Sequence, residues 1–374
     1  MSLILSKEHR EKAAEFRYFA EKNIDCGDDY PRANLQRAAE RGYMGLPIPR
    51  QYGGLGEDFL TYTLFIEEVS RICASTGVIM AVHTSVGSLP LLYFGSEEQK
   101  RRYLVKLARG EYIGAFALTE PDAGSDAAAI STGARPVHGG YRLTGRKIFI
   151  TSGGEADLYT IFATIDPSLG RKGITAFLVE KGSPGLTVGR IESKMGLHRT
   201  HTAELLMEDL YVPVSNRLEK EGKGFSVAMS LLDGGRIGIA AQGLGIAAAA
   251  LDYGMLCLKK RADWKEGNGQ GKRFELANLA TRLEAARLLT YRAAANRDTG
   301  KGKAMEASMA KTAATDLAME AASWCIETCS FEGIIQGSLP VRLFCDAKAT
   351  QIYEGTNQIQ RIVIARSCSE VRGS

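Results

Sequence analysis

Residues 236–260 read RIGIAAQGLGIAAAALDYGMLCLKK, a run with many alanines and few charges. Alanine favours helix, and the scarcity of charge indicates that this long helix is buried between others. Downstream, residues 274–296 place leucines at three- and four-residue steps, which predicts an amphipathic helix. Predicted helices over 304–329 and 347–368 complete a unit of about four helices.

Upstream of this unit, from about 116 to 220, the pattern changes from helical to extended. Segments 158–165, 174–179, 186–191 and 202–212 are rich in β-branched and aromatic residues and are bounded by Gly, Pro or Asp. Residues 141–151, YRLTGRKIFIT, are predicted to form two strands about a turn. Strands at such short intervals, with no helices between them, indicate an antiparallel sandwich or barrel.

The first 115 residues again have helical patterns, for example over 6–23 and 30–41. Glycine-rich loops such as QYGGLG at 51–56 separate the helices. The predicted fold class is therefore α+β. We expect an N-terminal helical domain at 1–115, a middle β domain at 116–220 and a C-terminal helical bundle at 221–374.

The charge balance excludes one class of partner. Lysine and arginine number 47 and aspartate and glutamate 43, so the net charge is only +4, and the two signs are interspersed. This pattern gives no electrostatic footprint for nucleic acid. It remains compatible with an anionic ligand that is bound by a few arginines.

The cysteines and the N-terminus bear on the compartment. Seven cysteines are scattered without CxxC or zinc spacing, so no metal site is predicted, and Cys325 and Cys329 are interpreted as structural. Charges within the first ten residues argue against a signal peptide. No stretch is judged to approach the ~18–20 apolar residues of a membrane span. These features favour a reduced, cytoplasmic protein.

The segment ALTEPDAGSD at 117–126 combines hydroxyls, small residues and successive backbone N–H groups in a turn. Such a concavity suits a phosphate or a ring carbonyl. The same residues could equally form an Asx/Pro turn that leads into a helix. This segment alone does not decide between the two.

The segment KIFITSG at 147–153 places an aromatic residue before hydroxyls at a strand end. Such a residue can stack on a flat ring, although a core phenylalanine is the more common role for it. In IYEGTNQIQR at 352–361, Glu354 stands among apolar residues and before a glycine. Desolvation would raise its pKa and make it a general base; alternatively, it satisfies a helix N-terminus.

Together and in this order, these segments resemble the acyl-CoA dehydrogenase family, most closely its short-chain, butyryl-type branch. The resemblance covers most of the chain. It is carried by YGGLG at 52–56, SRICASTGVIMAVHTSV at 70–86, ALTEPDAGSD at 117–126, KIFITSG at 147–153, KMGLHRTHTAEL at 194–205, DGGRIGIAAQGLGIAAAALD at 233–252, LEAARLLTYRAA at 283–294 and QIYEGTNQIQRIVIA at 351–365.

The resemblance implies FAD in a cleft between the β domain and the C-terminal helices, and a homodimer or homotetramer. It implies an acyl-CoA substrate, a role in fatty acid metabolism and an electron-transfer flavoprotein as acceptor. The residues that would bind FAD are Phe116, Leu118, Thr119, Gly124, Ser125, Phe149, Ile150, Thr151, Arg261, Trp264, Thr356, Asn357 and Gln358. The residues that would bind substrate are Ser125, Asp233, Arg236, Tyr353 and Gly355.

The reaction that the resemblance implies is α,β-dehydrogenation of a short-chain acyl-CoA to the trans-2-enoyl-CoA. Glu354 would remove the α-proton while the β-hydride passes to flavin N5. Some family members carry this base immediately before the arginine that corresponds to Arg236. That position is Gly235 in this chain, which has no side chain, so Glu354 is the expected catalytic residue.

Several positions depart from the family pattern. Glu327 replaces a glutamine near the FAD diphosphate, Phe331 replaces a glycine, Cys345 replaces an arginine, and His198 stands where relatives often have arginine. Two alternatives therefore stay open. One is a dehydrogenase or flavin oxygenase that acts on carrier-protein-tethered substrates. The other is a catalytically silent member with weakened FAD binding.

Overall fold

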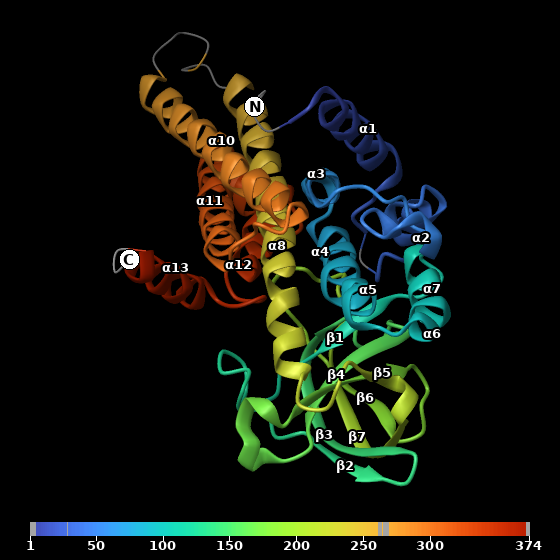
Figure 1. The fold of residues 1–374 in the computed structure, drawn as a ribbon. Coiled ribbons are helices and arrows are strands. Elements are labelled where there is room, and N and C mark those ends of the chain that lie inside the picture. The colour runs from blue at the N-terminus through green and yellow to red at the C-terminus, as the bar shows by residue number, and fades with distance from the viewer. Residues whose placement is uncertain (1–4, 28, 261–263, 265–268, 372–374) are drawn as a thin grey trace.

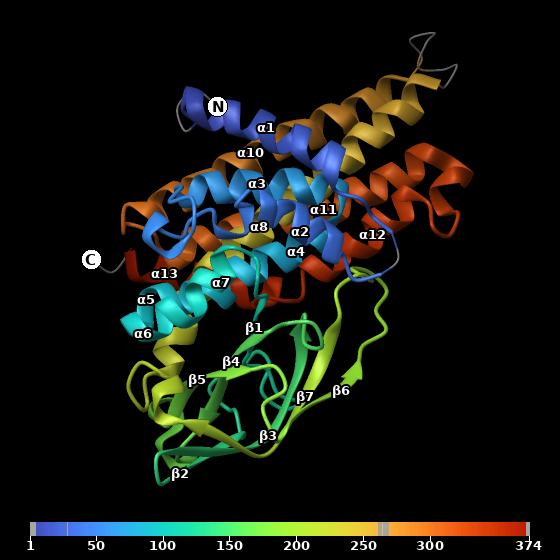
Figure 2. The same ribbon diagram turned by 90° about the vertical axis from the view of Figure 1, so that its right-hand side faces the viewer.

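The computed structural model describes residues 5–27, 29–260, 264 and 269–371. Helices form one end of the molecule and a β domain forms the other, and the long helix α8 runs from the β domain into the helices (Figure 1). The second view shows the same separation of helical and β layers (Figure 2). The predicted α+β class and the order helices, β domain, helices are therefore confirmed.

The N-terminal helices pack around a core of aromatic and aliphatic side chains. Ser6 caps the first helix by accepting a hydrogen bond from the His9 backbone, so the chain is fixed where helix formation starts. The helical segments are α1 (Lys7–Asn23), α2 (Arg32–Glu40), η1 (Tyr43–Gly45), η2 (Arg50–Tyr52), α3 (Phe59–Ile72), α4 (Ala74–Val82), η3 (His83–Ser88), α5 (Leu89–Phe94), α6 (Glu97–Gln99), η4 (Lys100–Leu104) and α7 (Val105–Ala108).

The β domain contains one eight-stranded sheet in which β6, β7, β3, β2, β4, β5 and β8 are neighbours in that order and β1 pairs with β4. The strands are β1 (Gly114–Ala117), β2 (Gly133–Val137), β3 (Gly140–Thr151), β4 (Leu158–Thr164), β5 (Ile174–Glu180), β6 (Leu186–Ile191), β7 (Thr202–Pro213) and β8 (Arg217–Leu218), with η5 (Pro167–Lys172) and η6 (Val214–Asn216) between strands. Most neighbouring strands pair antiparallel, as expected, whereas β1 and β2 both pair with β4 in parallel.

The prediction of two strands about a turn at 141–151 is wrong. Residues 140–151 form the single strand β3, which pairs with β7 along its length and changes register between Leu143 and Gly145. Gly145 has φ 151°, and a Cβ atom there would approach Thr132 Oγ1 to 2.6 Å. The glycine therefore allows a local irregularity in the ladder without reversing the chain.

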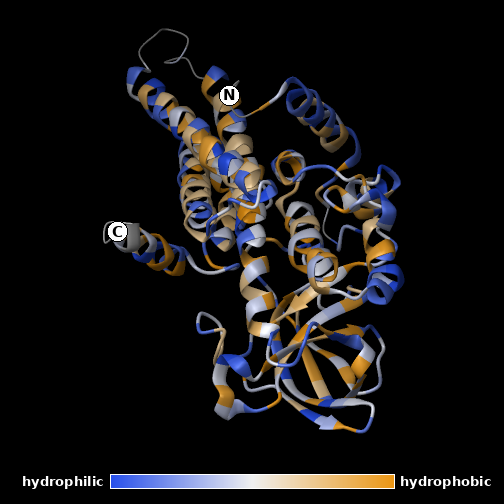
Figure 3. Ribbon diagram, in the orientation of Figure 1, coloured by the Kyte–Doolittle hydropathy of each residue, from blue (hydrophilic) through white to orange (hydrophobic). Residues whose placement is uncertain are grey.

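The C-terminal helices are α8 (Gly224–Lys260), α10 (Gln270–Asp298), α11 (Ala304–Cys329), η7 (Ser330–Ile334), α12 (Leu339–Thr350) and α13 (Asn357–Val371). Figure 3 shows pale and orange colours along much of α8, whereas α1 is largely blue. Two expectations need correction. The long helix begins at Gly224, twelve residues before the predicted start at 236, and the predicted helix 347–368 is broken between Thr350 and Asn357.

Two helical stretches correct the expectation about membrane spans. Ala74–Phe94 and Gly224–Lys260 are long and apolar enough to cross a membrane by length and composition alone. In the most apolar window of each, 83% and 78% of the residues are buried inside the protein. Their apolar surface is therefore covered by neighbouring helices and strands, as in a core helix.

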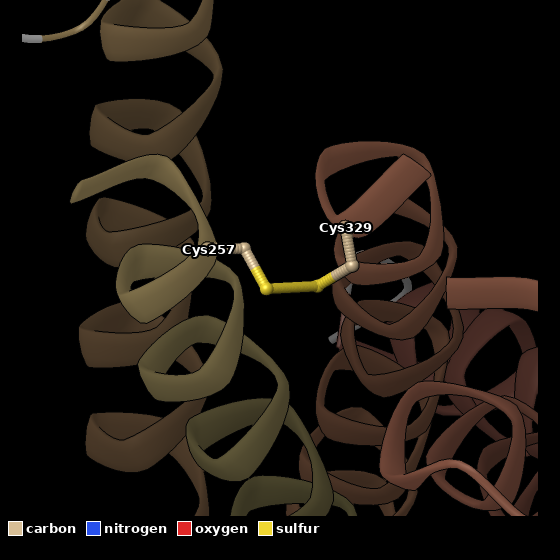
Figure 4. The surroundings of a disulfide bond; sticks show 2 residues. All are labelled: Cys257 and Cys329. Atoms are coloured by element: carbon tan, nitrogen blue, oxygen red, sulfur yellow. A yellow bond between two sulfur atoms is a disulfide. The ribbon is translucent and has the colours of Figure 1, made fainter. Parts of the chain in front are cut away.

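The cysteines also differ from the expectation of reduced thiols. Cys257 on α8 and Cys329 at the end of α11 form a disulfide between helices that pack side by side (Figure 4). Cys329 thus bonds across the helix interface, and Cys325, one turn earlier on α11, remains a buried free thiol. Cys26 and Cys73 are free thiols whose sulfur atoms lie 3.0 Å apart.

Candidate active site

A cavity of about 620 Å³ lies where the β domain, α8 and the C-terminal helix α13 meet. Of the residues predicted to bind cofactor or substrate, it brings together Phe116, Leu118, Thr119, Gly124, Ser125, Thr151, Arg236, Glu354 and Gly355. Val82 and Val86 close it from the N-terminal helices. Segments that are far apart in the sequence therefore form one site.

Glu354 lies in the break between α12 and α13. It has φ 53° and is followed by Gly355 with φ 86°, so two successive residues adopt the left-handed conformation. A glutamate accepts this conformation at a cost, and the glycine accepts it freely. These two residues lie in the turn that separates α12 from α13 and so interrupts the helix predicted from the sequence pattern.

The Glu354 carboxyl group is directed into the protein. Its Oε2 atom is buried and has no hydrogen-bond partner among the described residues. Burial raises the pKa of Glu354 to about 7, against the opposing effect of the nearby cations Arg236 and Lys311. A carboxylate whose pKa lies near neutral pH is suited to act as a general base.

Gly235 on α8 lies directly beside this carboxyl group. A Cβ atom at Gly235 would lie 2.6 Å from Glu354 Oε2, well inside van der Waals contact. A side chain at 235 and the Glu354 carboxyl therefore compete for the same space. This geometry supports the prediction that the base is attached at 354 in this chain.

The β-domain wall of the cavity rests on a buried ion pair. Lys147 on β3 is fully buried, and its Nζ donates to Glu120 Oε1 at 2.7 Å and to the Leu118 carbonyl at 3.0 Å. The Ile148 backbone N–H donates to the Thr119 carbonyl at 2.9 Å. The two predicted flavin segments are thus fixed against each other before any ligand arrives.

The three residues Phe149, Ile150 and Thr151, which were predicted to bind the flavin, differ in their exposure. Thr151 lines the cavity, Ile150 is buried, and Phe149 is 57% exposed. Phe149 has φ 58° and lies where β3 changes register against β7, which turns its ring outward. The alternative of a core phenylalanine is therefore wrong, and stacking on a flavin stays a prediction.

Other predicted site residues lie outside the cavity lining. Asp233 faces a neighbouring cavity and accepts from Arg236 Nη1 at 2.8 Å. Thr356 caps the start of α13 by accepting from the Ile359 backbone, and Gln358 is exposed. Trp264 packs under the Arg273 guanidinium. Arg261 lies outside the described residues.

Asn357 and Tyr353, which were also predicted to lie in the site, make hydrogen bonds that hold the Glu354 turn. Asn357 is buried, and its amide group bonds to Lys311, Thr315 and Asp316, so its side chain braces α11 instead of facing the cavity. The Tyr353 hydroxyl donates to Gln242 on α8. Gln242 in turn donates to the Ala74 carbonyl.

Sequence reasoning missed three basic residues. Arg171 and Arg366 line the cavity, and Lys311 lies buried behind the Glu354 turn. Lys311 had a usable signal, because it stands between alanines on a helix face with Ala307, Ala314 and Ala318. Arg171 and Arg366 carried no such signal, since they lie in surface segments that the fold alone brings together.

The residues present fit a flavin. A flat, largely apolar ring with a polar edge needs apolar walls, a few hydroxyls and an open approach. Phe116 and Leu118 supply the walls, Thr119, Ser125 and Thr151 supply hydroxyls, and a Cβ atom at Gly124 would meet nothing within 4 Å. The volume also lies within the range typical of cofactor and ligand sites.

The site is a cleft between a β domain and a helical bundle, and a carboxyl group with a buried Oε2 atom stands at its wall. Family models for the N-terminal, middle and C-terminal domains of acyl-CoA dehydrogenase match residues 6–111, 115–210 and 222–369. The chain therefore belongs to the acyl-CoA dehydrogenase family, whose members bind FAD.

Individual relatives agree with this assignment. An acyl-CoA dehydrogenase of Bacillus subtilis is 50% identical over 341 residues, which cover 91% of this chain and 90% of that protein. Butyryl-CoA dehydrogenase from Megasphaera elsdenii has a TM-score of 0.94 at 39% identity and covers 97% of this chain and 98% of its own. A chain from work on the electron transferring flavoprotein of Acidaminococcus fermentans has a TM-score of 0.95 at 43% identity, covering 98% and 99%.

Proposed function

We propose that the chain is an FAD-dependent dehydrogenase that converts a short-chain acyl-CoA to the trans-2-enoyl-CoA. The observation that carries this proposal is the buried, unpartnered Oε2 atom of Glu354 at the wall of a cavity whose other residues fit a flavin. FAD, when bound, would supply the acceptor for the β-hydride, which carries both electrons of the oxidation.

The chain's own residues would acidify and remove the α-proton. Glu354 takes the proton, and burial keeps its pKa near 7 so that the ionised form is available at neutral pH. The resemblance assigns the Glu354 backbone N–H as a donor to the thioester carbonyl. Such a preorganised donor is worth about 3–4 kcal/mol in the transition state.

The charges around the cavity favour CoA over a protein-tethered thioester. Arg171 and Arg366 line the cavity and are both exposed, so they are accessible to the phosphates of a free nucleotide tail. A carrier-protein phosphopantetheine brings one phosphate, whereas CoA brings a diphosphate and a 3′-phosphate. The two exposed guanidinium groups of Arg171 and Arg366 therefore match the larger negative charge of CoA.

The packing beside Glu354 favours a short acyl chain. The α8 residues that line the cavity extend only as far as Arg236. Farther along α8, Gln242 is buried and accepts from the Tyr353 hydroxyl, so the space between helix and turn is filled. A long acyl chain would have to displace this hydrogen-bonded pair.

Anaerobic titration of the FAD-loaded protein with acyl-CoAs of graded length tests the proposal. Loss of the oxidised flavin absorbance should be fastest with four-carbon substrate and fall as the chain lengthens. Carrier-bound substrate and oxygen uptake are measured in parallel. Faster bleaching with the carrier-bound thioester would establish an enzyme for carrier-protein-tethered substrates. A colourless protein that cannot be loaded with FAD would establish a catalytically silent member of the family.

We propose further that the reduced enzyme is reoxidised by an electron-transfer flavoprotein and works as a cytoplasmic homo-oligomer in fatty acid metabolism, with a tetramer expected. The similarity to a chain from work on an electron transferring flavoprotein supports the partner. Exposed Phe331, Ile334 and Ile335 supply apolar surface for a second copy. Light scattering and reoxidation by purified electron-transfer flavoprotein test these points.

A further inference from the structure

Lys311 is a buried lysine that the proposed mechanism leaves without a role. It lies on α11 and is 0% exposed. Burying an ammonium group costs free energy unless it is hydrogen-bonded and its charge is compensated. Its position therefore needs a reason beyond packing.

The contacts of Lys311 lead to the turn that carries Glu354. Its Nζ atom donates to the Gly355 carbonyl at 3.0 Å and to Asn357 Oδ1 at 2.6 Å. Gln360 Nε2 donates to the same Gly355 carbonyl at 2.9 Å. Both oxygens that accept from Lys311 are neutral, so hydrogen bonding satisfies the ammonium group without neutralising its charge.

Several charged groups lie around Lys311. Arg236 faces it from α8, Asp316 from its own helix, Arg361 from α13, and Glu354 from the turn. Asp316 already accepts from Asn357, Gln351 and Arg361, so it is shared among several donors. Tyr62 of α3 and Tyr353 lie near Glu354.

We propose that Lys311 is a positioning residue for the base: its ammonium group holds the Glu354–Gly355 turn and stabilises the ionised Glu354 carboxylate. Gly355 follows Glu354 directly, so a bond to the Gly355 carbonyl restricts the backbone from which the carboxyl group projects. The catalytic role of Lys311 rests on the proposed function, whereas its effect on the protonation of Glu354 does not.

The two groups should titrate as a coupled pair. Burial lowers the pKa of Lys311 to about 7, and Glu354 opposes that shift. Burial raises the pKa of Glu354 to about 7, and Lys311 opposes that shift in turn. Each charge therefore favours the other, and removing the cation must raise the pH at which Glu354 loses its proton.

The test separates the hydrogen bonds from the charge with three variants. Lys311→Gln keeps a donor but removes the charge, Lys311→Arg keeps the charge, and Lys311→Met removes both. Lys348→Met is the matched control, because Lys348 is an exposed lysine that contacts Gln351 at the opposite end of the same turn. Should Lys311→Met fail to fold, the Gln and Arg variants still give the comparison.

The first measurement needs neither substrate nor turnover. Infrared difference spectra of the FAD-loaded protein follow the protonated carboxyl band of Glu354 against pH, and Glu354→Gln assigns the band. The midpoint should rise by about one pH unit or more in Lys311→Gln and Lys311→Met, a tenfold or larger shift in the equilibrium. It should stay within a few tenths of a unit in Lys311→Arg and Lys348→Met.

The second measurement is the pH profile of flavin reduction by acyl-CoA. The rate should fall at neutral pH in Lys311→Gln and recover at higher pH, because the base must be ionised. An unmoved infrared midpoint in Lys311→Gln overturns the inference. Failure of the wild-type flavin to bleach would instead count against the proposed function, and the infrared result would still decide the role of Lys311.

Discussion

The turn at 351–356 and the segment at 327–335 both leave a helix through a residue other than glycine in a positive-φ conformation. Glu354 has φ 53°, and Ser330 has φ 54° with ψ −132°. The first turn is held by buried side chains of α11 and α13. The second exposes 76% of Phe331 and 62% of Ile334 and is tied to α8 by the Cys257–Cys329 disulfide.

This difference separates two ways of holding an unfavourable backbone conformation. Around Glu354, polar side chains satisfy the backbone from inside the same chain, so the Glu354 side chain is positioned without a ligand or a partner. Around Ser330, apolar side chains point to solvent, and a covalent bond supplies the constraint. The Glu354 turn should therefore be the more rigid of the two.

The largest effect should come from Glu354→Gln. The amide has nearly the shape of the carboxyl group but cannot accept the α-proton, so flavin reduction should slow by roughly 10²–10⁴-fold. The flavin itself should remain bound, as its absorbance spectrum would show. Glu332→Gln, an exposed carboxylate of η7, is the control and should leave the rate unchanged. Equal losses in both variants would contradict the assignment of the base.

Gly235→Ala should have the next largest effect on rate. The new methyl group displaces the Glu354 carboxyl group, with which a Cβ atom would make a 2.6 Å contact. A misplaced base typically costs on the order of 10²-fold, although the flexible side chain can move aside at little cost in stability. Gly271→Ala is the control, since a Cβ atom there meets nothing within 4 Å. Stopped-flow flavin reduction compares the two variants.

Cys257→Ser should lower stability and leave the chemistry at Glu354 in place. The disulfide closes a loop with a sequence separation of 72, and a bond of this kind contributes roughly 2–4 kcal/mol to the free energy of unfolding. Urea unfolding with and without reductant measures the loss. Cys368→Ser removes an exposed free thiol and keeps the disulfide, so its stability should equal that of the unchanged chain both with and without reductant. A wild-type protein whose unfolding ignores reductant would show that the bond carries no stability.

The smallest effect should come from Ser330→Gly. Glycine adopts the Ser330 conformation without steric cost, so the variant should be more stable by about 1 kcal/mol. Ser323→Gly, in the regular part of α11, should instead be destabilised by about 0.5–1 kcal/mol. The flavin-reduction rate should change in neither. If both serines respond alike, Ser330 is not under strain.

Much of the fold could be predicted from the sequence because local patterns matched the final packing. The helix α11 begins and ends where the pattern predicts, at 304 and 329. The errors occur where a single residue interrupts a pattern or where packing extends one. Gly145 produced an irregular strand instead of a turn, and Gly224 starts α8 against the β5 strand, with which its Cβ would make a 2.6 Å contact.

The site could be predicted in part for a related reason. Glu354, Thr119 and Ser125 stand in segments whose local sequence shows their chemistry, and the structure brings them together. Arg366 and Arg171 could not be found, because their relation to Glu354 exists only after the β domain and α13 are in place. Sequence alone also does not tell which way a polar side chain at a helix start points: Asn357 bonds to side chains of α11, and its contact with FAD stays a prediction.

The close approach of Gly235 to Glu354 also limits how this site can change by mutation. The space between the two positions holds one carboxyl group, so moving the proposed base from 354 to 235 requires changes at both positions. A chain that gains glutamate at 235 first must crowd two like charges together, and one that loses Glu354 first has no base. Either single change should therefore lower activity, which disfavours stepwise relocation of the carboxyl group from 354 to 235.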